Sequence, residues 1–225
     1  MSSNEVVTDI DRPAAERVEA LADVPTAVVS DVTSAETVLD HEIGHAAGRP
    51  ALLGTAVTVR SPPGDNLMVH RALQLAEAGD VLVVDAGGHT DSGIWGELTS
   101  TSARAHGLRG TVVDGAVRDI REIDELGYPV YARAVSPKGS HKTVPGSINV
   151  PVACGGVTVN PGDVIVGDAE GVAVVPKDDA ETVAEAAEEK LETETELRER
   201  VADGEYLFDL LDLDDQYRDL EIAEH

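Results

Sequence analysis

The segment around Arg118 and Asp119 combines residue types that could hold an anionic ligand or a metal ion. The two residues follow a predicted buried strand, 110–114, and a glycine-containing turn. A helix over 119–126 is predicted to begin at Asp119. In α/β proteins, ligands gather at the carboxyl ends of strands, which is where such a pair would lie. Glu122 follows Asp119 at the spacing of a capping box, so this segment alone favours a helix cap over a metal ligand.

A second segment, residues 93–99, offers a place for a carboxylate. It leads into a predicted helix over 97–106, and a helix N-terminus presents free backbone N–H groups and the positive end of the helix dipole. Gly96 has no side chain, so the backbone there can approach a ligand closely. The alternative is that Gly96 and Trp95 only shape a packed loop. Trp95 is the sole tryptophan, and a core or interface position suits it better than a catalytic one.

Other kinds of chemistry find less support in the residues. A Schiff-base enzyme needs a desolvated lysine, whereas the four lysines of this chain lie among polar residues. No GxGxxG pattern indicates a nucleotide site, and the seven histidines include no HExxH pattern. His70 is expected to be a packed or capping residue rather than a ligand. Cys154, the single cysteine, is expected to be small and buried, and it excludes a disulfide within the chain.

The elements that must position these residues alternate between strands and helices, as in an α/β domain. Short apolar runs predict strands, and apolar residues at helical spacing that end at glycine predict helices. One helix is capped by Asp65 or Asn66 and runs to Ala78, and a loop is expected over 86–96. The remaining predicted elements are strands over 56–60, 81–85, 110–114 and 130–134 and helices over 14–22, 26–33, 97–106 and 119–126.

The later part of the chain changes to short strands separated by turns, which predicts mostly antiparallel pairing. A long acidic helix is predicted from Asp178 to about Val201. The tail beyond Gly204 either docks on a neighbouring subunit or is an acidic, mostly disordered segment. The predicted later strands are 157–159, 164–166 and 171–175. The predicted division is an N-terminal helical extension (1–25), an α/β domain (26–177) and an acidic C-terminal helix and tail (178–225).

The chain is strongly acidic, with a formal net charge of −26 from 43 acidic residues against 17 lysines and arginines. Such a surface repels nucleic-acid phosphates and anionic membranes, so neither is expected as a partner. An acidic excess throughout the chain indicates a halophilic protein; the alternative is a mesophilic protein with a solvated acidic helix. Residues 1–12 lack the apolar core of a signal peptide, and no apolar run approaches about 18 residues, so a cytoplasmic location is expected.

Several short segments, in their order along the chain, resemble those of a known protein family. Glu97 is followed, after twenty residues, by Arg118-Asp119. The other segments of the set are 95–97, 113–119, 127–133, 155–159, 161–163 and 167–168. Together they resemble the RraA-like proteins and the class II 4-hydroxy-4-methyl-2-oxoglutarate / 4-carboxy-4-hydroxy-2-oxoadipate aldolases, over roughly residues 26–176.

The resemblance implies a three-layer swivelling β/β/α domain and assigns roles by position. Asp119 would ligate a divalent metal, Mg²⁺ or Mn²⁺, and Arg118 would contact the pyruvyl oxygens of the substrate. Glu97 would help to place a metal-bound water, although aldolases of the family more often carry aspartate there, one methylene shorter. The substrate loop, whose backbone N–H groups would hold the substrate carboxylate, would consist of Gly96, Glu97, Leu98 and Thr99.

The implied activity is cleavage of a carbon–carbon bond in a small, pyruvate-derived 2-oxo acid, by retro-aldol cleavage, oxaloacetate decarboxylation or both. The alternative is a non-catalytic, protein-binding module of the ribonuclease-regulator type; Asp119 favours the enzyme, because those regulators lack the metal-binding aspartate. The resemblance also implies homotrimers or homohexamers with active sites at subunit boundaries. Carboxylates of the C-terminal helix such as Glu189 and Glu192 could reach a neighbouring subunit.

Overall fold

One eight-stranded sheet forms the centre of the protein in a computed structural model that describes residues 4–33 and 35–220. The strand order is β1-β5-β4-β3-β2-β9-β10, and β6 pairs with β2 beside that path. The pairs from β2 through β3 and β4 to β5 are parallel, and the others are antiparallel. The strands are β1 (Gly44–Ala47), β2 (Leu52–Arg60), β3 (Asp80–Trp95), β4 (Gly110–Val117), β5 (Val130–Val135), β6 (Ser147–Ile148), β9 (Val164–Gly167) and β10 (Val172–Val175).

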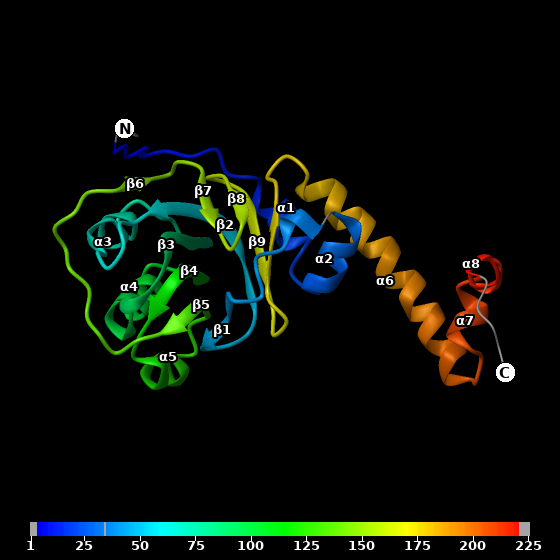
Figure 1. Cartoon of the computed structure of the whole chain (residues 1–225). Helices are drawn as coiled ribbons and strands as arrows, with labels where there is room; N and C mark the ends of the chain where they lie inside the picture. Colours follow the sequence, from blue (N-terminus) through cyan, green and yellow to red (C-terminus); the bar gives the residue numbers. More distant parts are fainter. Residues whose placement is uncertain (1–3, 34, 221–225) are drawn as a thin grey trace.

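Both faces of this sheet are covered, which gives three layers (Figure 1). Side chains alternate along a strand, so Leu82 and Val84 of β3 pack in one core cluster and Val81 and Val83 in another. The first face carries helices and the second carries a hairpin, which is the β/β/α arrangement that the resemblance implied. The helices are α3 (Leu67–Ala72), α4 (Glu97–Ala105) and α5 (Ile120–Leu126), and the hairpin strands are β7 (Val152–Cys154) and β8 (Val157–Val159).

Segments from the two ends of the chain meet at one edge of the sheet. Helices α1 (Ala15–Glu19), α2 (Thr26–Val32) and the beginning of α6 (Ala180–Ala202) pack on β9 and β10 in a third core cluster. Asp168, in the turn between these strands, accepts hydrogen bonds from the backbone N–H and the hydroxyl of Thr26, at 2.9 and 2.7 Å. These bonds fix the start of α2, which the 3-10 turn η1 (Ala35–Thr37) follows.

The rest of α6 projects beyond the body of the protein, and α7 (Leu207–Leu210) and α8 (Asp214–Asp219) lie near its far end (Figure 1). The predicted long acidic helix is confirmed. The tail forms two short helices up to residue 220; residues 221–225 lie outside the described residues, as do residues 1–3 of the segment considered as a signal peptide. No helix in the described ranges is both long and apolar enough to cross a membrane.

The loop predicted over 86–96 is wrong, because β3 continues through it to Trp95. Regular pairing with β4 reaches Asp85 and Asp114. Beyond two glycines with positive φ, Gly87 and Gly88, the strand pairs irregularly with β4 at His89, Gly93 and Trp95. Gly, Asp and Ser are turn formers, which is why this stretch resembles a loop in sequence. The stretch nevertheless forms a strand, because it pairs with β4, which itself extends beyond the predicted range 110–114.

The helices predicted over 97–106 and 119–126 are confirmed as α4 and α5, but α3 ends at Ala72 rather than near Ala78. After α3, Gln74 and Leu75 donate backbone hydrogen bonds only three residues back. The N–H of Glu77 donates to the Asp80 carboxylate at 2.7 Å, which holds the chain in a turn before β3. The antiparallel pairing predicted for the later strands is confirmed in the β7–β8 and β9–β10 hairpins.

Candidate active site

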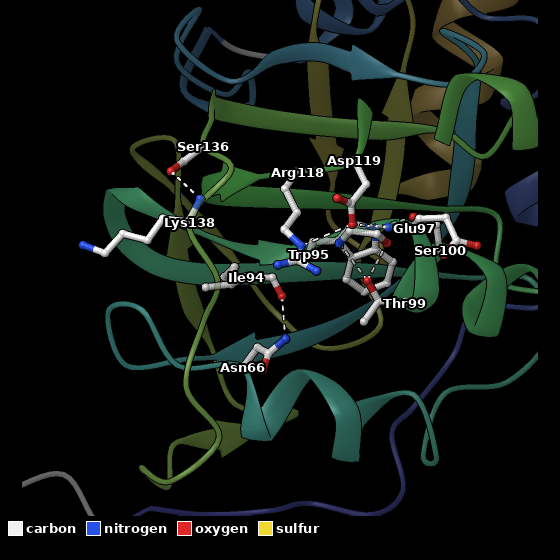
Figure 2. Close-up of polar contacts among 11 residues, drawn as sticks. Asn66, Ile94, Trp95, Glu97, Thr99, Ser100, Arg118, Asp119, Ser136 and Lys138 are labelled. Atoms are coloured by element: carbon white, nitrogen blue, oxygen red, sulfur yellow. Dashed lines mark hydrogen bonds and ion pairs between the residues drawn. The ribbon is translucent and has the colours of Figure 1, made fainter. Parts of the chain in front are cut away.

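The candidate site lies at the carboxyl ends of two neighbouring parallel strands, β3 and β4. Trp95 and Val117, the last residues of these strands, are register partners, and the N–H of Arg118 donates to the carbonyl of Trp95 at 2.9 Å. Each strand leads almost at once into a helix, α4 or α5. The segments 96–97 and 118–119, which are distant in sequence, therefore lie side by side (Figure 2).

Asp119 stands at the N-cap position of α5, but its side chain makes no capping hydrogen bond, so the capping hypothesis is wrong for this side chain. Its backbone is left-handed, with φ 57° and ψ 40°, a conformation that aspartate tolerates better than most residues. Its Oδ2 atom accepts hydrogen bonds from the backbone N–H of Glu97 and from Nε of Arg118, both at 3.2 Å (Figure 2). The carboxylate thus joins the start of α4 to the end of β4.

Gly96 is required by the space around it rather than by its backbone angles. Its φ of −161° is extended and open to any residue. A Cβ atom at this position would lie 2.5 Å from Oδ2 of Asp119 and 3.0 Å from Cγ of Arg118. The close approach of Arg118-Asp119 to the start of α4 therefore depends on the missing side chain.

The N-terminus of α4 leaves two backbone donors free. The N–H of Gly96 donates to Oγ1 of Thr99 at 2.9 Å, and the N–H of Glu97 donates to Asp119. The N–H groups of Leu98 and Thr99 have no acceptor among the described residues. Two unpaired donors at the positive end of a helix dipole form a binding site for a carboxylate.

The side chains of Glu97 and Trp95 have other partners. The Glu97 carboxylate accepts a hydrogen bond from the hydroxyl of Thr101 at 2.9 Å, so it lies along α4. Trp95 is buried; its Nε1–H donates to Oγ of Ser100 at 2.7 Å, and its ring stacks on Tyr128 with centroids 6.3 Å apart. The expected core position of Trp95 is confirmed. Glu97 contributes to the site through its backbone N–H.

A pocket of about 190 Å³ opens between these elements. Of the residues predicted from sequence to form the site, all but Glu97 line it: Gly96, Leu98, Thr99, Arg118 and Asp119. The side chains of Arg118 and Asp119, which line the pocket, are 42% and 36% exposed to solvent. The terminal nitrogens of Arg118 donate to no described residue, so they remain available to a ligand.

The pocket is also lined by residues that sequence reasoning missed: Asn66, His70, Ser140 and Lys142. His70 is not packed as expected, because it is exposed on α3 and lines the pocket. Burial of part of the ring, and then the charge of Lys142, lower the pKa of His70. The available signal was Lys142 itself, a cation within a turn-rich segment of an acidic chain.

Asp119 is also the residue best placed to hold a metal ion. The described residues contain no group of three His, Cys, Asp or Glu side chains that could enclose one. Among those residues, Oδ1 of Asp119 accepts no hydrogen bond, which leaves one carboxylate oxygen free beside the pocket. Mg²⁺ is commonly bound by one or two protein carboxylates together with waters and substrate oxygens, so this donor set fits such an ion.

Known proteins share both the sequence and the architecture of this chain. The RraA-like family, described as Aldolase/RraA, matches residues 26–174. A protein of Halalkalibacterium halodurans named "Putative 4-hydroxy-4-methyl-2-oxoglutarate aldolase" is 42% identical over 177 residues, which cover 79% of this chain and 84% of that protein. The matched region includes the whole site.

Two solved structures are similar over most of the chain. One, from Pseudomonas syringae, has a TM-score of 0.78 and 26% identity, and covers 88% of this chain and 98% of its own. The other, an unusual member of the RNase ES inhibitor RraA protein family from Streptomyces coelicolor, has a TM-score of 0.76 and 29% identity, and covers 84% of this chain and 100% of its own. The relatives thus include one named as an aldolase and one named for an inhibitor family.

Proposed function

Because this chain belongs to the RraA-like family (Aldolase/RraA), we propose that it is a divalent-metal-dependent lyase that cleaves a carbon–carbon bond of a pyruvate-derived 2-oxo acid. The two reactions are retro-aldol cleavage of a 4-hydroxy-4-methyl-2-oxoglutarate-type substrate and decarboxylation of oxaloacetate. Both leave the enolate of pyruvate, so one site can serve both. The observation that carries the proposal is the meeting of Arg118, Asp119 and the start of α4 in one pocket.

The residues of the pocket suit the charge of such an enolate. The free N–H groups of Leu98 and Thr99 would bind the substrate carboxylate at the N-terminus of α4. Arg118 would donate to the 2-keto oxygen through a charge-assisted hydrogen bond of about 1.5–3 kcal/mol. This bond strengthens as the oxygen gains negative charge, so Arg118 stabilises the transition state more than the bound substrate.

Asp119 would hold the divalent cation, Mg²⁺ or Mn²⁺, through its free carboxylate oxygen. When bound, the cation supplies Lewis-acid stabilisation of the enolate charge. The hydrogen bonds from Glu97 and Arg118 to the other oxygen keep the carboxylate in a fixed orientation. Such groups around a metal ligand tune its affinity for the ion.

The proposal is tested by pyruvate release from 4-hydroxy-4-methyl-2-oxoglutarate and from oxaloacetate, followed with lactate dehydrogenase and NADH. We expect the activity to vanish with EDTA and to return with excess Mg²⁺ or Mn²⁺. A protein-free reaction at the same Mg²⁺ concentration measures the background, because a divalent ion alone polarises a 2-oxo acid. Failure to exceed that background with either substrate would overturn the proposed activity.

A second candidate function is a non-catalytic module that binds another protein. The similarity to the Streptomyces coelicolor member of the RNase ES inhibitor RraA family supports it. A binding module has no need of an arginine and a carboxylate that converge on a pocket beside two free backbone donors, so the site favours the enzyme. Absence of turnover, together with specific binding of a ribonuclease, would favour the second candidate.

We further propose that the protein functions as a homotrimer or homohexamer with its pocket at a subunit boundary. Leu98, at the pocket, is 78% exposed in the single chain. Val201 and Leu207 are also exposed where α6 meets α7, and Glu189 and Glu192 are exposed on α6. Exposed apolar groups such as Leu98, Val201 and Leu207 often mark a surface that another subunit covers.

Light scattering above about 1 M KCl should give three or six times the mass of the chain. A fully active monomer would contradict the proposed assembly.

Halophilic behaviour is expected from the charge of the chain. With a net charge of −26, exposed carboxylates repel one another in dilute buffer, and assembly brings more of them together. At about 1 M salt the Debye length is roughly 3 Å, so most of this surface repulsion is screened. We expect the thermal midpoint and the activity both to rise from about 0.1 M to above 1 M KCl. Equal stability and activity across this range would leave the acidity as a solubility feature.

A further inference from the structure

Behind the start of α4 lies a buried hydrogen bond that has no part in the proposed chemistry. The indole Nε1–H of Trp95 donates to Oγ of Ser100 at 2.7 Å, and the two residues are 1% and 0% exposed. Trp95 is the last residue of β3, and Ser100 lies one turn into α4. The bond therefore joins the two ends of the segment 96–99, which is the proposed substrate loop (Figure 2).

The backbone of the same tryptophan holds Arg118. The carbonyl of Trp95 accepts a hydrogen bond from the N–H of Arg118 at 2.9 Å, and Trp95 is the register partner of Val117. The indole bond and the carbonyl bond thus connect one residue to two of the proposed binding elements, the start of α4 and the backbone of Arg118. A fixed Trp95 therefore fixes the position of these two elements relative to each other.

The ring of Trp95 is itself held in place by Tyr128. The two rings stack at an interplanar angle of 18°, with centroids 6.3 Å apart, and Tyr128 is 3% exposed. The hydroxyl of Tyr128 shares a hydrogen bond of 3.1 Å with the hydroxyl of Thr111 on β4. Burial raises the pKa of Tyr128, so the hydroxyl keeps its proton at neutral pH. The indole is therefore packed against a residue that is bonded to the central sheet.

The loop between Trp95 and Ser100 is held in one shape by its own hydrogen bonds. The N–H of Gly96 donates to Oγ1 of Thr99 at 2.9 Å, and its carbonyl accepts from the Thr99 hydroxyl at 2.8 Å and from the N–H of Ser100 at 3.0 Å. Among the described residues, the N–H groups of Leu98 and Thr99 have no acceptor. The two donors available to a carboxylate are thus part of an ordered loop, and the Trp95–Ser100 bond closes that loop.

We propose that Trp95 and Ser100 are positioning residues of the site: their hydrogen bond holds the loop so that the two free N–H groups of α4 and the side chain of Arg118 can bind one substrate together. The inference rests on the proposed function, since it takes these N–H groups as the donors to the substrate carboxylate. An error of about 1 Å in the position of such groups can cost on the order of 100-fold in activity. A bond that fixes both ends of the loop therefore affects binding as well as packing.

The test is Ser100→Ala, which suits a helix and leaves the buried indole N–H without its acceptor. With Mg²⁺ present, KM for the 2-oxo acid should rise about tenfold. The kcat should change by less than about twofold, because donors to the carboxylate bind the substrate and the transition state alike. A purely structural role would lower the fraction of folded protein instead, which reduces the apparent kcat and leaves KM unchanged.

Fluorescence gives a second readout, because Trp95 is the sole tryptophan of the chain. In Ser100→Ala the emission maximum should move to longer wavelength, since the indole N–H that has lost its acceptor turns to water. Trp95→Phe removes the same bond from its donor side. If the bond is the cause, KM of the double variant should be close to that of Trp95→Phe alone. Effects that multiply in the double variant would rule out the bond as the cause.

Tyr131→Phe is the matched control. Tyr131 is 0% exposed in the core cluster on the other face of the sheet, and its hydroxyl donates to the carbonyl of Asp168 at 2.8 Å. Its loss also removes one hydrogen bond of a buried aromatic residue, but far from the substrate loop. The thermal midpoint should fall, whereas KM and the emission maximum should stay as in the wild type.

An unchanged KM in Ser100→Ala, with the wild type active, would overturn the positioning role. A wild type that releases no pyruvate would refute the lyase, and amide hydrogen exchange then tests the role by itself. Exchange in the segment 96–101 that is faster in Ser100→Ala than in the wild type, and unaltered in Tyr131→Phe, would retain the role of the bond in ordering the start of α4. Equal exchange in Ser100→Ala and the wild type would refute it.

Discussion

Replacing Asp119 with alanine is expected to lower pyruvate release more than about 100-fold. Mutation of groups that only orient a metal ligand already costs roughly 10–100-fold in affinity or activity, and Asp119 is the proposed ligand itself. The fold should persist, because the side chain is 36% exposed and makes no hydrogen bond to its own helix. The measurement is kcat/KM at saturating Mg²⁺, with thermal unfolding recorded in parallel.

Glu122→Ala provides the control for this prediction. Glu122 is exposed in the first turn of α5, in the position that a capping box would have used. Its removal should leave both activity and folding almost unchanged. Near-normal activity in Asp119→Ala, by contrast, would mean that Asp119 only connects β4 to the start of α4, and the proposed metal site would be wrong.

Gly96→Ala is expected to lower activity by about 10–100-fold, because a misplacement of about 1 Å in a reacting group can cost that much. The added Cβ would lie 2.5 Å from Oδ2 of Asp119, so the carboxylate and Arg118 must move away from the start of α4. The backbone φ of −161° suits alanine, so the effect should be local. The measurement is kcat/KM together with the Mg²⁺ concentration that gives half-maximal activity, which should rise.

Gly44→Ala is the matched control for Gly96→Ala. Gly44 lies on β1, and a Cβ atom there would meet nothing within 4 Å. Both substitutions add one methyl group to an extended strand or strand end, so a difference between them reports the crowding at Asp119. Equal activities of the two variants would show that Arg118-Asp119 can shift without loss of function.

Hydrophobic patterning predicted the strands at the centre of the sheet because burial on both faces leaves a direct trace in the sequence. Residues 81–85 form a nearly continuous apolar run, and the structure places Val81 and Val83 on one face and Leu82 and Val84 on the other. The helix starts at Glu97 and near Asp119 were also predicted, although β3 and β4 run on to Trp95 and Val117, beyond the predicted ends of these strands.

Elements whose conformation depends on a distant partner were predicted poorly. The second half of β3 has the composition of a loop, and only its irregular pairing with residues 115–117 of β4 makes it a strand. The end of α3 was placed too late, since the Asp80 carboxylate that holds Glu77 in a turn competes with the helix. In both cases a tertiary contact overrides local propensity.

The amino-acid sequence by itself determined the α/β class, the acidic character and the spacing of Glu97 from Arg118-Asp119, because each is expressed in residue type and order. It left open whether the Asp119 side chain caps its helix or binds a metal ion, since both roles use the same residue at the same position. Only the tertiary structure decided this, by placing the end of β4 in register with the end of β3, so that the carboxylate meets the N–H of Glu97. Asp65 and Lys142 are likewise unrelated in sequence. Hydrogen bonds from the N–H groups of Thr143 and Val144 to the Asp65 carboxylate hold the segment that carries Lys142 beside the start of α3, and no local pattern encodes a contact between residues so far apart.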